Sequence, residues 1–402
     1  MLRLVLLALA TAALLPRACA DSAAAYTSHS FKVPKTHFFP VNPPFRADSN
    51  SDSSGSLDIN YVRSFGNLTD YNNRYTIYRD GGGSCSLSNL TFWFFCDTTV
   101  YDEDGSFAGF VSNSVAVANA YPHAGSLTDI TNTPDTGAHP AIPYTDAEAE
   151  VSDSASTRYA IWTYTNCVVL SDTKAAHFWN VVKFSSVDSS ASVGTTMAIY
   201  DLDLDNSTIS VTRQDQITYV TTQYAYGSFA NVVVDDVAYL YAIDGLYSEK
   251  EDIHVAKAPL ATFEDTSTWT FYDNSTSSWS SGMPAPTSRN RAGAVINSNM
   301  PFSSGNIYYS VYHQQYLLIF FNNYIDSTFR VLTAPSPVGP WTNDNKVLYK
   351  TRTGASYNYG AQSTPIYYQS SESAVAGKSI MLAYSYQSSS ATYLKALKLD
   401  FQ

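Results

Sequence analysis

A repeated segment constrains the fold of this chain more than any other feature of its sequence. Residues 253–259 have the sequence IHVAKAP and residues 329–335 the sequence FRVLTAP, so both carry V-x-x-A-P after an apolar start. Each copy follows an aromatic-rich stretch and precedes a Trp-Thr pair, which begins at Trp269 or Trp341. The Ala-Pro pair recurs after 76 residues and the tryptophan after 72. A repeat of about 75 residues indicates units that stack on one another, because one such unit cannot bury its own apolar face.

The rest of the chain has the pattern of short strands. Apolar or alternating runs recur between clusters of Gly, Asn, Asp, Ser and Pro, and helical periodicity is almost absent. Roughly five units fit into the chain, so we predict an all-β fold, a five-bladed β-propeller over residues 59–402. Residues 393–402 are expected to close the ring, and the polar segment 121–157 to be a loop. A pair of β-sandwiches would not explain the repeat. A propeller of seven shorter blades is an alternative that counting residues does not exclude.

The N-terminus has the pattern of a secretory leader. Arg3 precedes an apolar stretch that ends at Ala18-Cys19-Ala20, so residues 1–20 are predicted to be a signal peptide. Residues 21–58 are rich in Ser, Ala and Pro and are expected to form an extended arm. No later apolar run has the about 18 residues of a membrane span, so we predict a secreted monomer that does not enter membranes. Four N-x-[ST] sequons are expected glycan acceptors: Asn67, Asn89, Asn206 and Asn274.

The charge balance narrows the class of partner. Lys and Arg number 23 and Asp and Glu 35, which gives a formal net charge of −12. This field disfavours nucleic acid and other anionic polymers, so the expected partner is a neutral polysaccharide or oligosaccharide. The chain has 31 tyrosines, whose flat faces and hydroxyls suit sugars, although most are expected to fill strands.

The cysteines and the potential metal ligands constrain the function less than the charge does. Three cysteines remain after the leader, which predicts one disulfide and one buried thiol without fixing the pairing: Cys85, Cys96 and Cys167. The histidines lack metal-like spacing, and no phosphate-binding glycine loop occurs. Asp201, Asp203 and Asp205 could hold calcium, but an exposed strand explains them equally well. We therefore predict neither a cofactor nor a metal.

Two carboxylates are the candidates for catalysis. Asp97 follows the apolar run 91–96, and Asp80 begins the segment Asp80-Gly81-Gly82. Glycoside hydrolysis needs two such groups about 5–9.5 Å apart, and aromatic surroundings raise the pKa of one so that it can act as an acid. The structural alternatives are an Asp-Gly turn for Asp80 and a strand cap for Asp97.

Other residues are weaker candidates. Asp235 and Asp236 are expected to form a hairpin turn between two strands. Five residues are candidates for substrate binding, although each could equally be structural: Trp179, Arg291, His313, Tyr359 and Gln362.

Three motifs carry a family resemblance: the Asp80-Gly81 pair, the segment from Trp93 to Thr98, and Ser112-Asn113-Ser114. This pattern, over roughly residues 60–400, resembles a secreted propeller family of formerly unknown function that includes endo-D-arabinanases. The later segments VAKAPLATFEDTSTW and SPVGPWT are similar to family 43-type glycosidases. The resemblance implies that the paired aspartates of the family correspond to Asp80 and Asp97. Gln362 stands where the resemblance leads us to expect a histidine.

These observations predict a secreted glycoside hydrolase that cleaves a neutral, arabinan-like polysaccharide, with Asp80 and Asp97 as its catalytic pair in the propeller channel. A non-catalytic carbohydrate-binding propeller is the alternative, and it would need no converging carboxylates. A polysaccharide lyase is a third possibility, which the acidic charge disfavours because a lyase needs basic groups for a uronate.

Overall fold

The computed structural model describes residues 28–33, 56–68, 75–88, 90–118, 127–131, 138–152, 157–186, 189–214, 218–244, 251–284, 292–297, 302–322, 326–353, 357–364, 377–388 and 392–402. The expected signal peptide, Asn89 and Arg291 lie outside the described residues. Within the expected N-terminal arm, Ser28–Lys32 form strand β1. No helix in the described part of the chain is long and apolar enough to cross a membrane.

The described residues form six antiparallel sheets, which confirms the prediction of an all-β fold. One sheet contains β3 (Thr76–Arg79), β6 (Thr98–Tyr101) and β7 (Phe107–Val111). The next contains β4 (Gly83–Leu87), β5 (Leu90–Phe95), β8 (Ser114–Ala118) and β9 (Leu127–Asp129). The largest contains β1, β10 (Arg158–Trp162), β11 (Val168–Val169), β12 (Lys174–Ser186), β13 (Ser189–Asp203), β14 (Thr208–Arg213) and β15 (Tyr219–Val220).

Three sheets follow in the second half of the chain. The first contains β16 (Ala230–Val234), β17 (Val237–Ile243), β18 (Asp252–Pro259), β19 (Thr270–Asp273), β20 (Ser278–Ser280) and β21 (Ile296–Asn297). The second contains β22 (Ser304–Ser310), β23 (Gln315–Asn322), β24 (Thr328–Ala334) and β25 (Lys346–Lys350). The last contains β2 (Ile59–Asn67), β26 (Tyr359–Thr364), β27 (Ser379–Gln387) and β28 (Thr392–Phe401).

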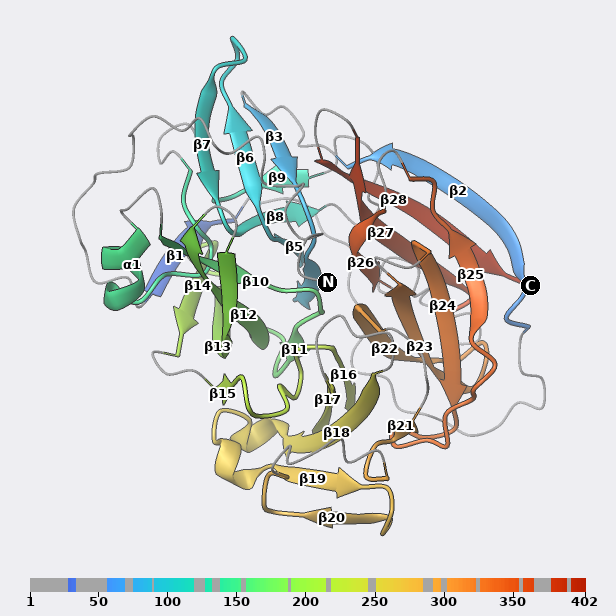
Figure 1. Cartoon of the computed structure of the whole chain (residues 1–402). Helices are drawn as coiled ribbons and strands as arrows, with labels where there is room; N and C mark the ends of the chain where they lie inside the picture. Colours follow the sequence, from blue (N-terminus) through green and yellow to red (C-terminus); the bar gives the residue numbers. More distant parts are fainter. Residues whose placement is uncertain are drawn as a thin grey trace.

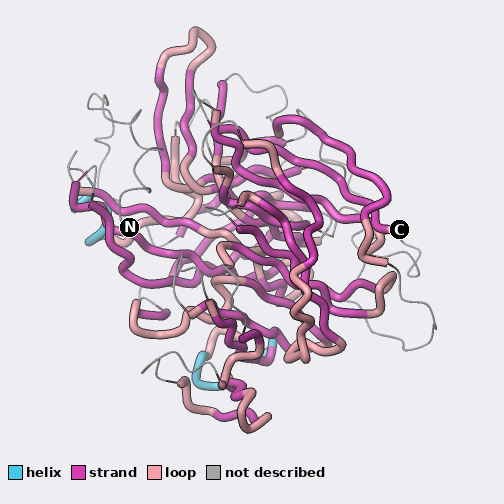
Figure 2. The backbone as a smooth tube through the Cα atoms, turned by 45° about the vertical axis from the view of Figure 1, so that its right-hand side comes forward, coloured by secondary structure: helices cyan, strands magenta, loops and turns pink. Residues whose placement is uncertain are grey.

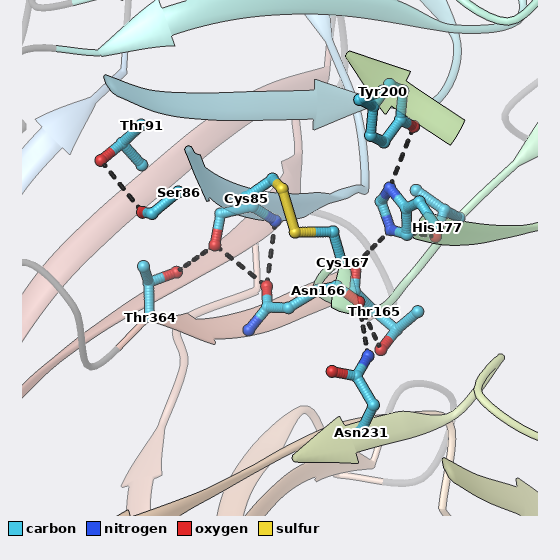
Figure 3. The surroundings of a disulfide bond; sticks show 12 residues. Cys85, Ser86, Thr91, Thr165, Asn166, Cys167, His177, Tyr200, Asn231 and Thr364 are labelled. Atoms are coloured by element: carbon cyan, nitrogen blue, oxygen red, sulfur yellow. Dashed lines mark hydrogen bonds between the residues drawn. A yellow bond between two sulfur atoms is a disulfide. The ribbon is translucent and has the colours of Figure 1, made fainter. Parts of the chain in front are cut away.

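The sheets succeed one another around a common centre (Figure 1). Strand β11 contacts β4 and β16, and β22 contacts β16 and β26. The hydroxyls of Ser84 on β4 and Thr364 on β26 lie 3.2 Å apart, which brings the sheet of β26, β27 and β28 next to that of β4. Polar side chains occupy this centre. The Asn166 amide donates to the Ser363 carbonyl, and the Asn231 amide donates to the Asn166 carbonyl (Figure 3).

Strand pairing joins the two ends of the described chain. Strand β28 lies between β27 and β2, so a strand from the beginning of the chain completes the sheet built by its end. The sequence repeat corresponds to equivalent strands, because β18 and β24 each pair with an aromatic-rich strand, β17 and β23. Figure 2 shows that strands dominate the backbone and that the β6–β7 hairpin projects beyond the other strands.

Burial explains the apolar run before Asp97. Every residue of β5 is buried, with Phe92 and Phe94 in one core cluster and Trp93 and Phe95 in another. A strand covered on both faces has a continuous apolar run instead of an alternating one. Cluster packing between adjacent sheets therefore fixes the position of the residues that follow β5.

The segment 121–157 contains more than the expected loop. It includes β9 and the helix α1 (Asp146–Ser152). Thr145 and Glu148 cap the helix reciprocally: the Glu148 carboxylate accepts the Thr145 N–H at 3.0 Å, and the Thr145 hydroxyl accepts the Glu148 N–H at 3.4 Å. Glu148 also pairs with Arg213 on β14, which holds the helix against the neighbouring sheet.

The structure resolves the cysteine pairing. Cys85 on β4 and Cys167 beside β11 form a disulfide across 82 residues of sequence, and it joins two neighbouring sheets (Figure 3). Cys96 is a buried free thiol.

Candidate active site

Three neighbouring segments of the chain each run from one sheet into the next, and each has a short break in its strand at the same height. Both candidate aspartates lie in these breaks. Residues 80–82 separate β3 from β4, residues 96–97 separate β5 from β6, and residues 112–113 separate β7 from β8. The register is the same on both sides of the interruption, since Arg79 is opposite Thr98 and Gly83 is opposite Phe94. Asp80 is therefore opposite Asp97. The chain passes from one sheet to the other at each interruption, so Asp80 lies between β3 and β4 and not in a hairpin turn, and Asp97 lies between β5 and β6.

Backbone hydrogen bonds hold the two aspartates together. The Asp80 N–H donates to the Asp97 carbonyl at 3.1 Å, and the Cys96 N–H donates to the Asp80 carbonyl at 2.8 Å. Directly opposed residues of an antiparallel pair have Cβ atoms about 4.5–5.5 Å apart and lie on one face of the sheet. The interruption thus presents two neighbouring carboxylates.

Glycines after Asp80 make this arrangement possible. Gly81 and Gly82 have φ of +52° and +124°, values that residues with a Cβ adopt at a cost. A Cβ on Gly82 would lie 1.7 Å from the Phe94 carbonyl oxygen, so no larger residue fits. Gly360 also has a positive φ, and its own Cβ would lie 2.5 Å from the Gly81 Cα. This close approach brings β26, with Tyr359 at its start, against Asp80.

Asp80 is partly buried and has a specific donor. The Tyr359 hydroxyl donates to its Oδ2 at 2.7 Å. Burial and then the nearby charge of Asp97 raise the pKa of Asp80 well above its usual value, while the hydrogen bond from Tyr359 opposes the rise. The Asp80 carboxyl therefore keeps its proton at pH values where an ordinary aspartate is ionised.

Asp97 has surroundings that favour its ionised form more strongly. The Trp162 indole N–H donates to its Oδ1 at 2.8 Å. Burial raises the pKa of Asp97 to about 6, while the positive charge of Arg158 and the hydrogen bond from Trp162 limit the rise. Two carboxyl groups in different surroundings are the usual arrangement of an acid and a base.

Residues around the pair set its geometry. The Cys96 thiol donates to the Thr163 carbonyl at 3.1 Å, and burial keeps the pKa of this thiol well above its usual value. The Asn113 amide donates to the Ile161 carbonyl and its oxygen accepts the Ile142 N–H. Asn113 therefore anchors β10, the strand that supplies Trp162. Sequence reasoning did not single out Trp162 and Arg158, because both lie within an ordinary strand pattern.

Tyr359 is the one predicted binding residue that contacts the pair in the described part of the chain, and three others are buried. Trp179 is fully buried, and its indole donates to the Tyr200 hydroxyl at 3.0 Å, so it lies in the core instead of at an accessible surface. His313 is buried near a hairpin turn, where Ser310 and the Ser56 carbonyl contact its ring nitrogens. Gln362 is buried on β26, and neither of its amide atoms has a hydrogen-bond partner among the described residues.

The remaining acidic and glycan-acceptor candidates lie elsewhere. Asp235 and Asp236 form the exposed turn between β16 and β17, as predicted. Among the described residues, no group of three or more His, Cys, Asp or Glu side chains could hold a metal ion. Asn206 and Asn274 are exposed in hairpin turns, whereas Asn67 is partly buried at the end of β2.

Comparison with solved structures finds matches at low sequence identity. A candidate hydrolase from Bacteroides ovatus matches with a TM-score of 0.55 at 16% identity, over 82% of this chain and 86% of that one, which shows a common fold. An α-L-arabinofuranosidase from Podospora anserina in complex with cellotriose matches with a TM-score of 0.40 at 11% identity, over 83% and 95% of the two chains. A family 117 glycoside hydrolase from Zobellia galactanivorans matches with a TM-score of 0.46 at 11% identity, over 85% and 90%.

No curated protein matches the chain. Residues 66–393 match the model of a family described as a domain of unknown function, DUF5005. That description names no activity, so the resemblance to endo-D-arabinanases stays a prediction. The match spans most of the chain, from the end of β2 into β28, and the chain therefore belongs to the DUF5005 family.

Proposed function

We propose that this protein is a glycoside hydrolase and that Asp80 and Asp97 are its catalytic pair. The observation that carries the proposal is the opposition of two partly buried carboxyls, both with raised pKa values and each with its own hydrogen-bond donor. A structural cap or turn needs one carboxylate and gains nothing from a second beside it. A non-catalytic carbohydrate-binding protein would likewise have no use for two converging carboxyls, whose repulsion costs stability.

The proposed fold is a five-bladed β-propeller. The sheets β3–β6–β7 and β4–β5–β8–β9 would be the two halves of one blade, since the same three strands run through both in one register. The other four sheets would supply one blade each. In this arrangement the interruption of the first blade faces the funnel between that blade and its two neighbours, which supply Tyr359 and Trp162.

The different surroundings of the two aspartates suggest a role for each. Asp80, whose pKa lies well above its usual value and is not lowered by the charge of Arg158, would protonate the glycosidic oxygen as the leaving group departs. Asp97, ionised above a pH of about 6, would attack the anomeric carbon. Directly opposed cross-strand residues favour the short separation, about 5–5.5 Å, of enzymes that retain the anomeric configuration. Asp80 would then remove a proton from the water that hydrolyses the glycosyl–Asp97 ester.

The proposed substrate is a neutral, arabinan-like polysaccharide. The formal net charge of −12 disfavours acidic glycans. We also propose that the protein is secreted as a monomer, cleaved after Ala20, and glycosylated at its exposed sequons. A loss of mass upon deglycosylation of the secreted protein would support this location, and the absence of any loss would count against it.

Screening for hydrolysis tests the proposal. The purified protein is incubated with arabinan, xylan, β-glucan, mannan and galactan, and released sugars are resolved by chromatography. Asp97→Asn serves as the inactive variant, and Asp235→Asn, which changes an exposed turn aspartate, as the matched control. Products formed by the wild type and Asp235→Asn alone support the proposal. Equal products from Asp97→Asn would remove the pair from catalysis.

A further inference from the structure

A pocket lies between β3 and the start of β28, and Arg79, the residue before Asp80, is part of its lining. Its volume is about 330 Å³, which is near the lower end of the about 300–1,000 Å³ of small-molecule sites. Its walls include Asn67 at the end of β2, Tyr75 and Tyr78 before Asp80, and Thr392 and Tyr393 at the start of β28. These residues come from distant parts of the sequence, and they meet because β28 pairs with β2 and also contacts β3.

The walls of the pocket suit an uncharged, hydroxyl-rich ligand. Tyr78 packs edge to face against Tyr393, with ring centroids 5.5 Å apart, and both rings are partly exposed. Arg79 is the charged lining residue, and Asp129 already pairs with it at 2.5 Å with side chains that are 3% and 2% exposed. The described lining residues therefore offer aromatic faces and polar tips, and none of them contributes a charge without an ion-pair partner.

A chain of contacts joins this pocket to the catalytic pair. Tyr78 and Arg79 directly precede Asp80. The Thr392 side chain lies close enough to the Tyr359 hydroxyl to lower the pKa of that hydroxyl, which donates to Asp80. A ligand that contacts Thr392 therefore lies next to the residues that hold Asp80.

We propose that this pocket, defined by Tyr75, Tyr78, Thr392 and Tyr393, binds one uncharged sugar unit of the polysaccharide chain cleaved at Asp80 and Asp97. The inference rests on the proposed function and adds a subsite to it. Its volume admits a single ring, so occupancy requires a substrate long enough to span from the catalytic pair into the pocket. The sugar would stack on Tyr78 and take hydrogen bonds from Asn67 and Thr392.

The proposed subsite predicts that Asn67 carries no glycan. Asn67 is a sequon, yet its side chain lines the pocket. A glycan on this nitrogen would occupy the space that the substrate unit needs. We therefore expect Asn67 to carry no glycan in the secreted protein and the exposed Asn206 to carry one.

Binding of oligosaccharides tests the pocket independently of turnover. Arabino-, xylo- and cello-oligosaccharides of two to six units are titrated calorimetrically into Asp97→Asn protein, so that none is consumed. Adding Tyr78→Ala is expected to weaken the binding of the longest bound oligosaccharide at least ~10-fold and to leave the disaccharide unchanged. Tyr61→Ala, at an exposed tyrosine of β2 that is 53% exposed and outside the pocket, is the matched control.

A second variant guards against misfolding. Thr76 is an exposed lining residue of β3, so Thr76→Tyr should fill the pocket without removing a core contact, and it should produce the same length-dependent loss. Unchanged affinity in both variants, absence of saturable binding to every oligosaccharide, or peptide mapping that finds glycan on Asn67 would each overturn the inference. Binding that depends on Tyr78 without any hydrolysis by the wild type would support the pocket and refute the proposed catalysis.

Discussion

Replacing Asp97 with Asn is expected to make the protein more stable at neutral pH while it removes catalysis. Burial raises the pKa of Asp97 from 3.8 to about 6, so the folded state disfavours the ionised carboxylate. Between these two pKa values the unfolded chain releases its proton while the folded chain keeps it, and the wild type loses stability as pH rises. A shift of this size corresponds to about 3 kcal/mol above pH 6. Asn has no charge to bury, and its oxygen can still accept the Trp162 N–H.

Urea denaturation at two pH values measures the effect. At pH 4 the free energies of unfolding of wild type and Asp97→Asn should be similar, because the folded wild type is mostly protonated there. At pH 7.5 the variant should be more stable by up to about 3 kcal/mol. Asp235→Asn, at an exposed aspartate, should give no such difference. A variant that is equally stable or less stable than the wild type at pH 7.5 would contradict this reasoning. It would show that the ionised Asp97 carboxylate does not destabilise the folded protein.

Three further predictions concern the pair and its frame. Tyr359→Phe removes the hydrogen-bond donor to Asp80. We expect kcat/KM to fall about 10-fold and the alkaline limb of its pH profile to move to higher pH, because the hydrogen bond lowers the pKa of Asp80. An alkaline limb that does not move would show that Asp80 is not the general acid. Cys85→Ser opens a loop of 82 residues and should lower the free energy of unfolding by about 4 kcal/mol. The melting temperature of the variant should not change when dithiothreitol is added. A melting temperature equal to that of the oxidised wild type would contradict the expected loss of stability. Deleting residues 392–402 removes the strand between β2 and β27 and exposes two edges; we expect no cooperative melting, and an unchanged melting temperature would show that β28 is dispensable.

Much of the fold could be predicted from sequence because the signals are local. The repeated V-x-x-A-P segments correspond to β18 and β24, the same position in successive sheets. The helix α1 escaped prediction because it is short and its capping pair, Thr145 and Glu148, lies inside a proline-rich segment. The disulfide could not be assigned, since three cysteines allow three pairings and only the fold brings Cys85 to Cys167.

The site was predictable in part for the same reason. Asp80 and Asp97 stand out because each interrupts a strongly marked strand, and their opposition follows from strand register. Trp162 and Arg158 reach Asp97 from the neighbouring sheet, and no local pattern reports such a contact. Trp179 was misleading because β12 is buried on both sides, and a core tryptophan and a sugar platform have the same local sequence signal.

The most direct test of the account compares kcat/KM for Asp80→Asn, Asp97→Asn and the double variant on the glycan that the wild type hydrolyses. If the two carboxyls act as one acid–base unit, each single variant should lose about 10²–10⁴-fold, and the double variant should lose little more than either. All three should remain folded and bind the same oligosaccharides. Single variants that each keep more than about a tenth of the wild-type activity would contradict the central claim that Asp80 and Asp97 carry the reaction.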